Sequence, residues 1–179
     1  YSLGVASGAI SVSLSGGGLS GPVTVDTTID DENIKLDVVD GNTLLSSGSV
    51  VVDGPIDILR AIGVRGVSLT AGSGNQSVEG NAGDDTLDGG EGDDTAVFSG
   101  NRSDYTVTEE SGGFRLVDER AGTNDGSDLA INIETFQFAD GNVAAADLLS
   151  SSTSNQPPVA SPATAEATED GPVVTGQLE

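Results

Sequence analysis

Residues 71–97 read AGSGNQSVE-GNAGDDTLD-GGEGDDTAV and divide into three consecutive rows of nine residues. Glycine recurs at the second or fourth place of each row, and an aspartate holds the sixth place of the last two rows, at Asp85 and Asp94. One apolar residue stands at the eighth place of each row: Val78, Leu87 and Ala96. This spacing predicts a tight turn followed by a short strand in each row, with one inward-facing side chain per strand.

Glycine and aspartate recur in these rows because a tight turn that binds a cation needs both. Glycine reaches the positive φ angles that a tight turn requires, and it leaves the backbone carbonyls uncovered. Calcium prefers roughly six to eight oxygen ligands, drawn from carboxylates and carbonyls. A single row cannot bury its apolar residue, whereas stacked rows can. The rows therefore predict a β-solenoid whose turns can hold cations.

Row by row, the pattern is close to G-G-x-G-x-D-x-U-x, the nonapeptide of calcium-binding β-rolls, and the stretch resembles the RTX (hemolysin-type calcium-binding) family. In that family successive turns lie on opposite sides of the roll, so that every second row stacks and calcium lies between stacked turns. The resemblance implies that the turn at 72–76 stacks on the turn at 89–94. It also implies that the turn at 80–85 stacks on SGNRSD, residues 99–104, which again ends in aspartate.

We therefore expect Ca²⁺ as the cofactor, with one ion near Asp94 and a second between Asp85 and Asp104. By this resemblance the metal-site residues are Gly72, Gly74, Gln76, Gly83, Asp84, Asp85, Gly90, Gly92, Asp93, Asp94 and Asp104. Asp125 and Asp128, in the sequence NDGSD, could also bind calcium, although Asn-Asp-Gly is an ordinary turn sequence as well.

The rows depart from the family pattern at their N-terminal end. The first row has Gln76 where the family has aspartate and Ala71 where it has glycine, so its site should be weaker. Residues 62–70, IGVRGVSLT, keep the spacing without a carboxylate and predict a calcium-free row. The simplest alternative is that all these rows are only glycine- and aspartate-rich loops. A catalytic role fits less well, because adjacent carboxylates on glycine turns bind cations more readily than they hold a substrate.

The composition agrees with a cation-binding solenoid. The chain has 179 residues, with 29 Asp and Glu against 6 Lys and Arg, and a formal net charge of -23. This charge argues against nucleic acid and anionic membrane surfaces as partners and favours divalent cations. Aromatic residues make up 3 %, too few for a large globular core. Such a composition is also typical of disorder, but a disordered chain has no such periodicity.

The chain lacks cysteine, so disulfides and thiol chemistry are excluded. It also lacks an initiating methionine, a signal peptide and a long apolar run that could insert into a membrane. We expect a piece of a longer protein, or a processed one.

The roll is predicted to occupy residues 62–104, with β-rich segments on both sides. Residues 1–61 alternate apolar and polar side chains, which predicts strands that extend or cap the roll, or else form a separate small sandwich. Within them, IDILRAIG (56–63) could be a short helical turn or a strand. TTIDDEN (27–33) is predicted to be a solvated acidic loop rather than a further cation site.

The segment that follows the rows differs in composition. Five of the six aromatic residues lie between Phe98 and Phe138, and the opening VFSG-x-x-x-DY resembles the cap that follows RTX rows in many secreted proteins. We expect residues 105–148 to form a C-terminal cap with an aromatic core, because a solenoid end exposes its core and must be covered.

The last residues differ again. Residues 149–163 have the Ser/Pro-rich composition of a linker. Residues 164–179 contain ATEDGPVVTG, which resembles the first strand of the cadherin-like and VCBS repeats of bacterial adhesins, and which could otherwise act as a donor strand.

Three functions follow from these features. The first is a calcium-locked structural segment of a secreted adhesin, which the family resemblance implies is exported by type I secretion to the surface of a Gram-negative bacterium. Its partners would be calcium and neighbouring domains of the same chain. The second is a protomer of an extracellular filament or S-layer, whose C-terminal tail pairs with a neighbouring copy. The third, an enzyme, has no support, because the chain has no histidine and no G-x-S-x-G motif.

Overall fold

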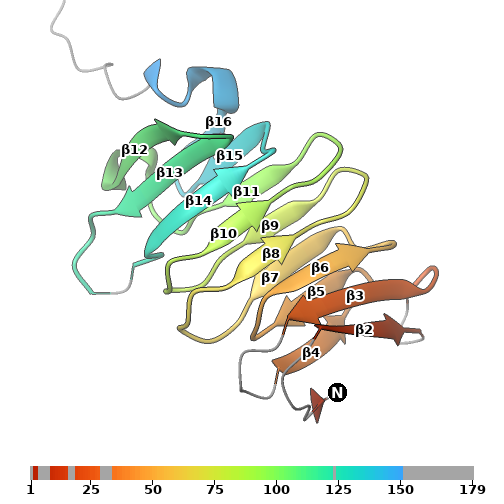
Figure 1. The fold of residues 1–179 in the computed structure, drawn as a ribbon. Coiled ribbons are helices and arrows are strands. Elements are labelled where there is room, and N and C mark those ends of the chain that lie inside the picture. The colour runs from red at the N-terminus through yellow and green to blue at the C-terminus, as the bar shows by residue number, and fades with distance from the viewer. Residues whose placement is uncertain (1, 4–8, 16–18, 29–33, 123, 151–179) are drawn as a thin grey trace, which may run out of the picture.

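The computed structural model is an all-β roll in which two sheets of eight strands each lie along the length of the molecule (Figure 1). It describes residues 2–3, 9–15, 19–28, 34–122 and 124–150. The acidic stretch at 29–33 and nearly all of the predicted linker and C-terminal segment lie outside the described residues.

The first sheet has the strand order β1-β4-β5-β7-β9-β11-β15-β16. Its strands are β1 (Ser2–Leu3), β4 (Ile34–Val39), β5 (Thr43–Ser46), β7 (Ile58–Ala61), β9 (Ser77–Glu79), β11 (Thr95–Val97), β15 (Thr135–Phe138) and β16 (Gly141–Ala144). From β5 to β15 the neighbouring strands are parallel, and the pairs at both ends of the sheet are antiparallel.

The second sheet has the order β12-β13-β14-β10-β8-β6-β3-β2. Its strands are β2 (Ala9–Leu14), β3 (Val23–Thr28), β6 (Val50–Asp53), β8 (Ser68–Thr70), β10 (Thr86–Asp88), β12 (Tyr105–Glu110), β13 (Gly113–Asp118) and β14 (Ser127–Ile131). The pairs from β6 to β14 are parallel. Two short 3₁₀ helices, η1 (Arg102–Asp104) and η2 (Ala145–Asp147), accompany the C-terminal strands.

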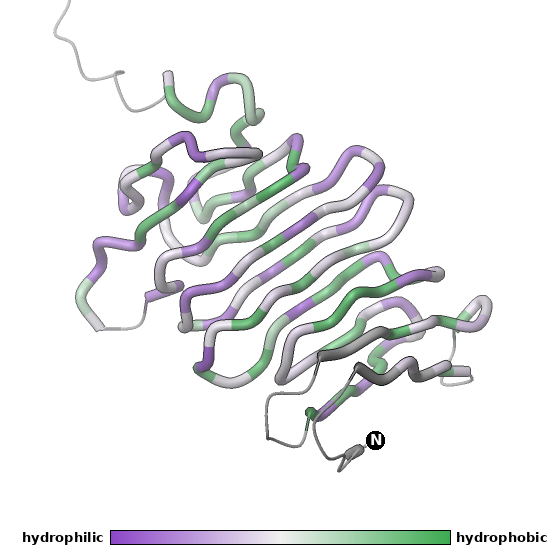
Figure 2. Tube along the Cα trace, viewed as in Figure 1, coloured by the Kyte–Doolittle hydropathy of each residue, from purple (hydrophilic) through white to green (hydrophobic). Residues whose placement is uncertain are grey.

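The nine-residue rows produce the parallel centre of the roll, as their spacing predicts. Consecutive rows alternate between the two sheets, so Leu69 pairs with Leu87 in one sheet and Val78 with Ala96 in the other. These four side chains are fully buried, and in Figure 2 hydrophobic colour runs along the strands while several turns are hydrophilic. The predicted fold class, a parallel β-roll, is confirmed.

The N-terminal strands continue both sheets instead of forming a sheet of their own. Strands β2, β3 and β6 lead into β8, and β4, β5 and β7 lead into β9. IDILRAIG forms strand β7 and not a helical turn, because Leu59 stacks directly on Val78 in the core. The segment thus extends the roll, while the predicted domain boundaries remain predictions.

Aromatic side chains fill the C-terminal end of the roll. The ring of Phe98 packs 5.3 Å from that of Tyr105 and 5.7 Å from that of Phe138, measured between centroids. Arg102 covers this cluster: its guanidinium donates to the carbonyl oxygens of Tyr105 (2.9 Å) and Leu148 (2.8 Å). All five of these residues are buried. The cluster is therefore core, and the hairpin of β12 and β13 covers one sheet edge beside it.

No helix within the described ranges is long and apolar enough to cross a membrane.

Candidate metal centre

The turns that precede the parallel strands form two columns on opposite sides of the roll (Figure 1). The Asp94 column contains the turns at 72–76, 89–94 and 132–134, which lead into β9, β11 and β15. The Asp85 column contains the turns at 63–67, 80–85 and 124–128, which lead into β8, β10 and β14. The register of the strands aligns one residue of each turn, which corresponds to the sixth place of a row and lies directly before the strand, except in β14, where it is the second residue. This residue is Gln76, Asp94 and Glu134 in one column and Val67, Asp85 and Asp128 in the other.

Backbone hydrogen bonds hold the first two turns of the Asp94 column together. Gly74 N donates to Glu91 O (2.7 Å), and Glu91 N donates to Gly72 O (3.1 Å). Asp94 joins this contact, because its Oδ1 accepts a hydrogen bond from Gln76 N at 2.6 Å. The predicted stacking of 72–76 on 89–94 is confirmed.

Two glycines make this close stacking possible. A methyl group on Gly92 would lie 1.9 Å from Gly74 O, and one on Gly90 would lie 2.3 Å from Gly72 O. Both glycines also have positive φ angles, 140° and 83°. Any side chain at either position would push the turns apart, so the glycines keep the carbonyls of the column uncovered and close together.

Glu134, which the nonapeptide spacing does not reveal, ends the Asp94 column. Its Oε2 accepts a hydrogen bond from Asp94 N at 2.7 Å, and Thr135 N donates to Asp94 O at 3.0 Å. The Glu134 carboxylate thus accepts a hydrogen bond from the backbone N of Asp94, just as the Asp94 carboxylate accepts one from the backbone N of Gln76. A signal is present in the sequence, since ETFQ at 134–137 has the same acid-polar-apolar order as DTAV at 94–97.

The Asp85 column is more thoroughly hydrogen-bonded. Asp85 Oδ1 accepts from Val67 N (2.7 Å), and its Oδ2 accepts from Asn81 N (2.6 Å). Asp128 Oδ1 accepts in turn from Asp85 N at 2.8 Å. Asp84 adds a parallel contact, because its Oδ1 accepts from Ser127 N at 3.0 Å. The next turn in this column is therefore 124–128.

The prediction that residues 99–104 stack on the turn at 80–85 is wrong. The last three of these residues form η1 instead, and Asp104 Oδ2 accepts a hydrogen bond from the backbone N of the N-cap residue, Asn101, at 2.8 Å. The chain then leaves the roll through the hairpin of β12 and β13 and returns in β14. Asp128, not Asp104, accordingly faces Asp85 in the column.

Asp125 lies in the turn at 124–128, but its carboxylate contacts residues of the cap and not Asp85. Its carboxylate accepts hydrogen bonds from Ser99 N (2.8 Å) and from the Tyr105 hydroxyl. Arg120 Nη2 lies 3.5 Å from the same carboxylate and 2.6 Å from Asp118 Oδ2. This network fixes the loop that leads into the turn at 124–128.

The three aspartates at the sixth place are buried, whereas Glu134 is exposed, and burial changes the acidity of the aspartates. Burial, with the negative charges of Asp85, Asp125 and Asp84 nearby, raises the pKa of Asp128 to about 8. Burial also raises the pKa of Asp85, to which the charge of Asp84 adds. These groups therefore favour a proton or a cation beside them.

Asp94 is in the same situation in the other column. Burial raises its pKa, and the charges of Glu134, Asp88 and Asp93 raise it further. Its side chain is 0 % exposed, and its Oδ2 has no hydrogen-bond partner. A buried carboxylate oxygen without a donor is costly unless a proton or a cation neutralises it.

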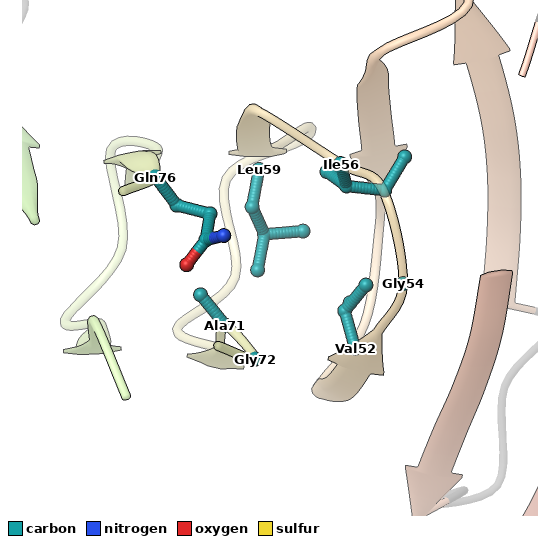
Figure 3. A pocket seen from close by; sticks show the side chains of 7 residues that line it. All are labelled: Val52, Gly54, Ile56, Leu59, Ala71, Gly72 and Gln76. Carbon is teal, nitrogen blue, oxygen red and sulfur yellow. The ribbon is translucent and has the colours of Figure 1, made fainter. Parts of the chain in front are cut away.

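Gln76 faces a different environment. Figure 3 shows its amide pointing toward Leu59 and Ala71 in the roll interior, beside a gap too narrow for a water molecule. Its Nε2 donates to Ser73 O at 3.2 Å, whereas its Oε1 is buried without a partner. As oriented here, the amide oxygen faces core side chains and not the column of turns.

These observations fit calcium and restrict how it can be bound. Over the residues that the structure describes, no three acidic, histidine or cysteine side chains converge into a metal site. Any ion in the columns must therefore take several of its ligands from backbone carbonyls, which is common for Ca²⁺. The unpartnered Asp94 Oδ2 supplies a carboxylate oxygen, and Gly74 O is one of the backbone oxygens close to the stacked turns.

The fold and the two columns define a parallel β-roll with carboxylates aligned between its turns. Residues 69–100 match the family model of the RTX calcium-binding nonapeptide repeat, in 4 copies. This part of the chain therefore consists of RTX repeats, and calcium is the cofactor that such repeats bind. Repeats of this family are typical of secreted proteins.

Two further comparisons complete this result. No curated protein matches the chain. Among solved structures, the chain is similar to the crystal structure of the extracellular lipase LipA from Serratia marcescens, with 24 % identity and a TM-score of 0.26. That match covers 45 % of this chain and 14 % of the lipase chain.

Proposed function

We propose that this chain is a calcium-stabilised structural segment of a large secreted surface protein of the adhesin type. The observation that carries the proposal is the alignment of Asp85 with Asp128, because two buried carboxylates in consecutive turns of one column favour a cation or a proton between them. The Asp94 column supports it with an unpartnered buried carboxylate oxygen.

Calcium would act by neutralising and cross-linking stacked turns. Asp85 and Asp128 would hold it in one column, and Asp94 in the other, with carbonyls of the glycine turns completing the coordination. When bound, the ion supplies the positive charge that the buried carboxylates lack. Extracellular calcium modules bind with Kd values of about 10⁻⁴–10⁻³ M, and a ligand at roughly 100 times its Kd adds about 2.7 kcal/mol of stability.

The net charge predicts how calcium should change the compactness of the chain. At a formal charge of -23 the compact state repels itself, so it should loosen when calcium is scarce and contract when calcium is abundant. This behaviour suits export by a type I system to the cell surface, with an unfolded chain inside the cell and a folded one outside.

We propose no catalytic activity. The chain has neither histidine nor cysteine to serve as a base or nucleophile. The buried aspartates accept backbone hydrogen bonds between stacked turns, where no substrate can reach them.

A calcium titration tests this function. Far-UV circular dichroism and size-exclusion chromatography should report gain of β structure and contraction as calcium rises to the millimolar range. Asp94→Asn should raise the calcium midpoint, whereas Asp104→Asn, the same change outside the columns, should leave it unchanged. A chain equally folded in chelator and in calcium would refute the proposal.

Assembly into a filament or S-layer is a second candidate. The two sheets end in the edge strands β1 and β2 at one end of the roll and β12 and β16 at the other. Edge strands can pair with a neighbouring copy. Higher-mass species in light scattering at saturating calcium would favour this candidate, and a monomer at all concentrations would exclude it.

A further inference from the structure

The two carboxylate oxygens of Asp94 have different surroundings. Oδ1 accepts a hydrogen bond from Gln76 N at 2.6 Å, which ties it to the turn at 72–76. Oδ2 is buried without any partner, in a side chain that is 0 % exposed. Oδ2 is therefore the oxygen of Asp94 that still needs a positive partner, because Oδ1 is already bonded to the turn at 72–76.

Gly89 shows where this second oxygen lies. A methyl group on Gly89 would lie 2.7 Å from Asp94 Oδ2 and 2.2 Å from the backbone oxygen of Asn132. Both oxygens thus face the same space beside the Gly89 Cα, on the side of the cap turn at 132–134. Gly89 N donates to Ile131 O at 3.0 Å and keeps this turn against the roll.

Asn132 is held in an unusual conformation that directs its carbonyl. Its φ angle is 50°, in the left-handed region that residues other than glycine rarely adopt. Its Nδ2 donates to Asp88 Oδ1 at 2.8 Å, and the same oxygen accepts from Gly90 N at 3.1 Å. The side chain of Asn132 therefore fixes the turn while its carbonyl lies beside Asp94.

Glu134 brings a second carboxylate to the same turn. Its Oε2 accepts from Asp94 N at 2.7 Å, so the two acidic residues are direct neighbours across the two turns. The negative charges of Glu134 and Asp88 both act on Asp94. The result is a group of oxygens with an excess of negative charge, where the repeats, which end at residue 100, meet the turn at 132–134.

We propose that the turn at 89–94 and the cap turn at 132–134 hold a calcium ion, with the carboxylates of Asp94 and Glu134 and the carbonyl of Asn132 among its ligands. This inference rests on the proposed function, since it requires the roll to bind calcium. Only Asn132 and Glu134 lie outside the nonapeptide pattern, and Glu134 takes the place that the aspartate of a following row would occupy. The calcium ion would fasten the turn at 132–134, and with it the cap, to the turn at 89–94.

Calcium-binding stoichiometry tests the site. Isothermal titration calorimetry of the whole chain with CaCl₂ would compare the natural sequence with Glu134→Gln, which keeps an oxygen that can accept from Asp94 N but removes the charge. Glu134→Gln should lose one bound calcium per chain or weaken one site at least tenfold. Glu109→Gln, the same change on an exposed residue of β12, should bind calcium like the natural chain.

Further variants distinguish the possible failures. A natural chain that binds no calcium would refute the proposed function as well as this site. A natural chain that binds calcium with the same stoichiometry and affinity as Glu134→Gln would overturn the site alone. Unchanged binding in Glu134→Gln with a loss in Glu134→Ala would also overturn it, because Glu134 would then act only as a hydrogen-bond acceptor.

A measurement on the natural chain covers the case in which these variants fail to fold. Crystals grown with Mn²⁺ in place of calcium should show an anomalous peak in contact with the carboxylates of both Asp94 and Glu134. Peaks confined to other turns would overturn the proposal.

Discussion

The two columns of turns both place carboxylates between stacked turns, but they use different residues and different hydrogen bonds. In the Asp85 column, two buried aspartates follow one another, and both oxygens of Asp85 already accept backbone hydrogen bonds. In the Asp94 column, the sixth places hold a neutral amide, an aspartate with one unpartnered oxygen, and a glutamate from the cap. Backbone hydrogen bonds therefore occupy both oxygens of Asp85 in the first column, whereas one buried oxygen of Asp94 in the second has no hydrogen-bond partner.

The largest effect that separates the columns should come from pH in the calcium-free chain. The folded-state pKa of Asp128 is raised to about 8, above its usual value of 3.8. Between about pH 4 and pH 8, Asp128 keeps its proton in the folded chain but releases it in the unfolded chain. The stabilisation is therefore complete below about pH 4 and is lost as pH rises through about 8, by up to about 1.4 kcal/mol per pH unit.

Urea denaturation in chelator at pH 5, 6.5 and 8 would measure this dependence. The denaturation midpoint should fall as pH rises, and Asp128→Asn should flatten the curve. Asp104→Asn should not flatten it, which separates Asp128 from the general effect of the acidic surface. A calcium-free chain that is more stable at pH 8 than at pH 5 would contradict the assignment.

The next effect concerns hydrogen bonding at the sixth place. Asp85→Ala would leave the backbone N–H groups of Val67 and Asn81 without their acceptor, at a cost of about 1–3 kcal/mol each when buried. Gln76→Ala removes a side chain whose only hydrogen bond shown goes to Ser73 O, and should cost less. Urea denaturation in saturating calcium should therefore show a loss at least twice as large for Asp85→Ala. Equal losses would mean that the columns do not differ in this way.

The smallest effect should be a gain in calcium affinity from a substitution at Gln76. Gln76→Asp would restore the family's aspartate in the first row of the Asp94 column and add a charge, which should tighten calcium binding about tenfold, or about 1.4 kcal/mol. Asn75→Asp adds the same charge one residue earlier, at an exposed position, and should have little effect. Calorimetric titration would compare the two. An equal gain in both variants would attribute the effect to overall charge.

Local spacing was sufficient to predict the centre of the fold. The nine-residue period identifies Leu69, Val78, Leu87 and Ala96 as core residues, because each short strand has one inward position. The family resemblance, applied to the same rows, implies that the turns at 72–76 and 89–94 are neighbours. These predictions succeed because stacking in a solenoid repeats one local conformation, so nearby residues carry most of the information.

The period could not predict how each column ends. Asp104 falls one residue out of register and is used inside η1, where it accepts a hydrogen bond from Asn101 N. Asp128 reaches Asp85 only after a hairpin, 43 residues further along the chain. Glu134 has the right neighbours in sequence but follows a turn of a different length. A local period contains no information about where an inserted hairpin returns the chain to the roll.

The sequence by itself determined the core side chains and the turns that could hold cations, because glycine, aspartate and one apolar residue recur at fixed places. The family that this pattern resembles implied the parallel roll, its alternating turns and calcium as its cofactor. Only the tertiary structure decided which carboxylates meet: Asp128 with Asp85, and Glu134 with Asp94. The physical reason is that the strand register of β14 and β15 places these residues, and that register depends on pairing between segments far apart in the chain.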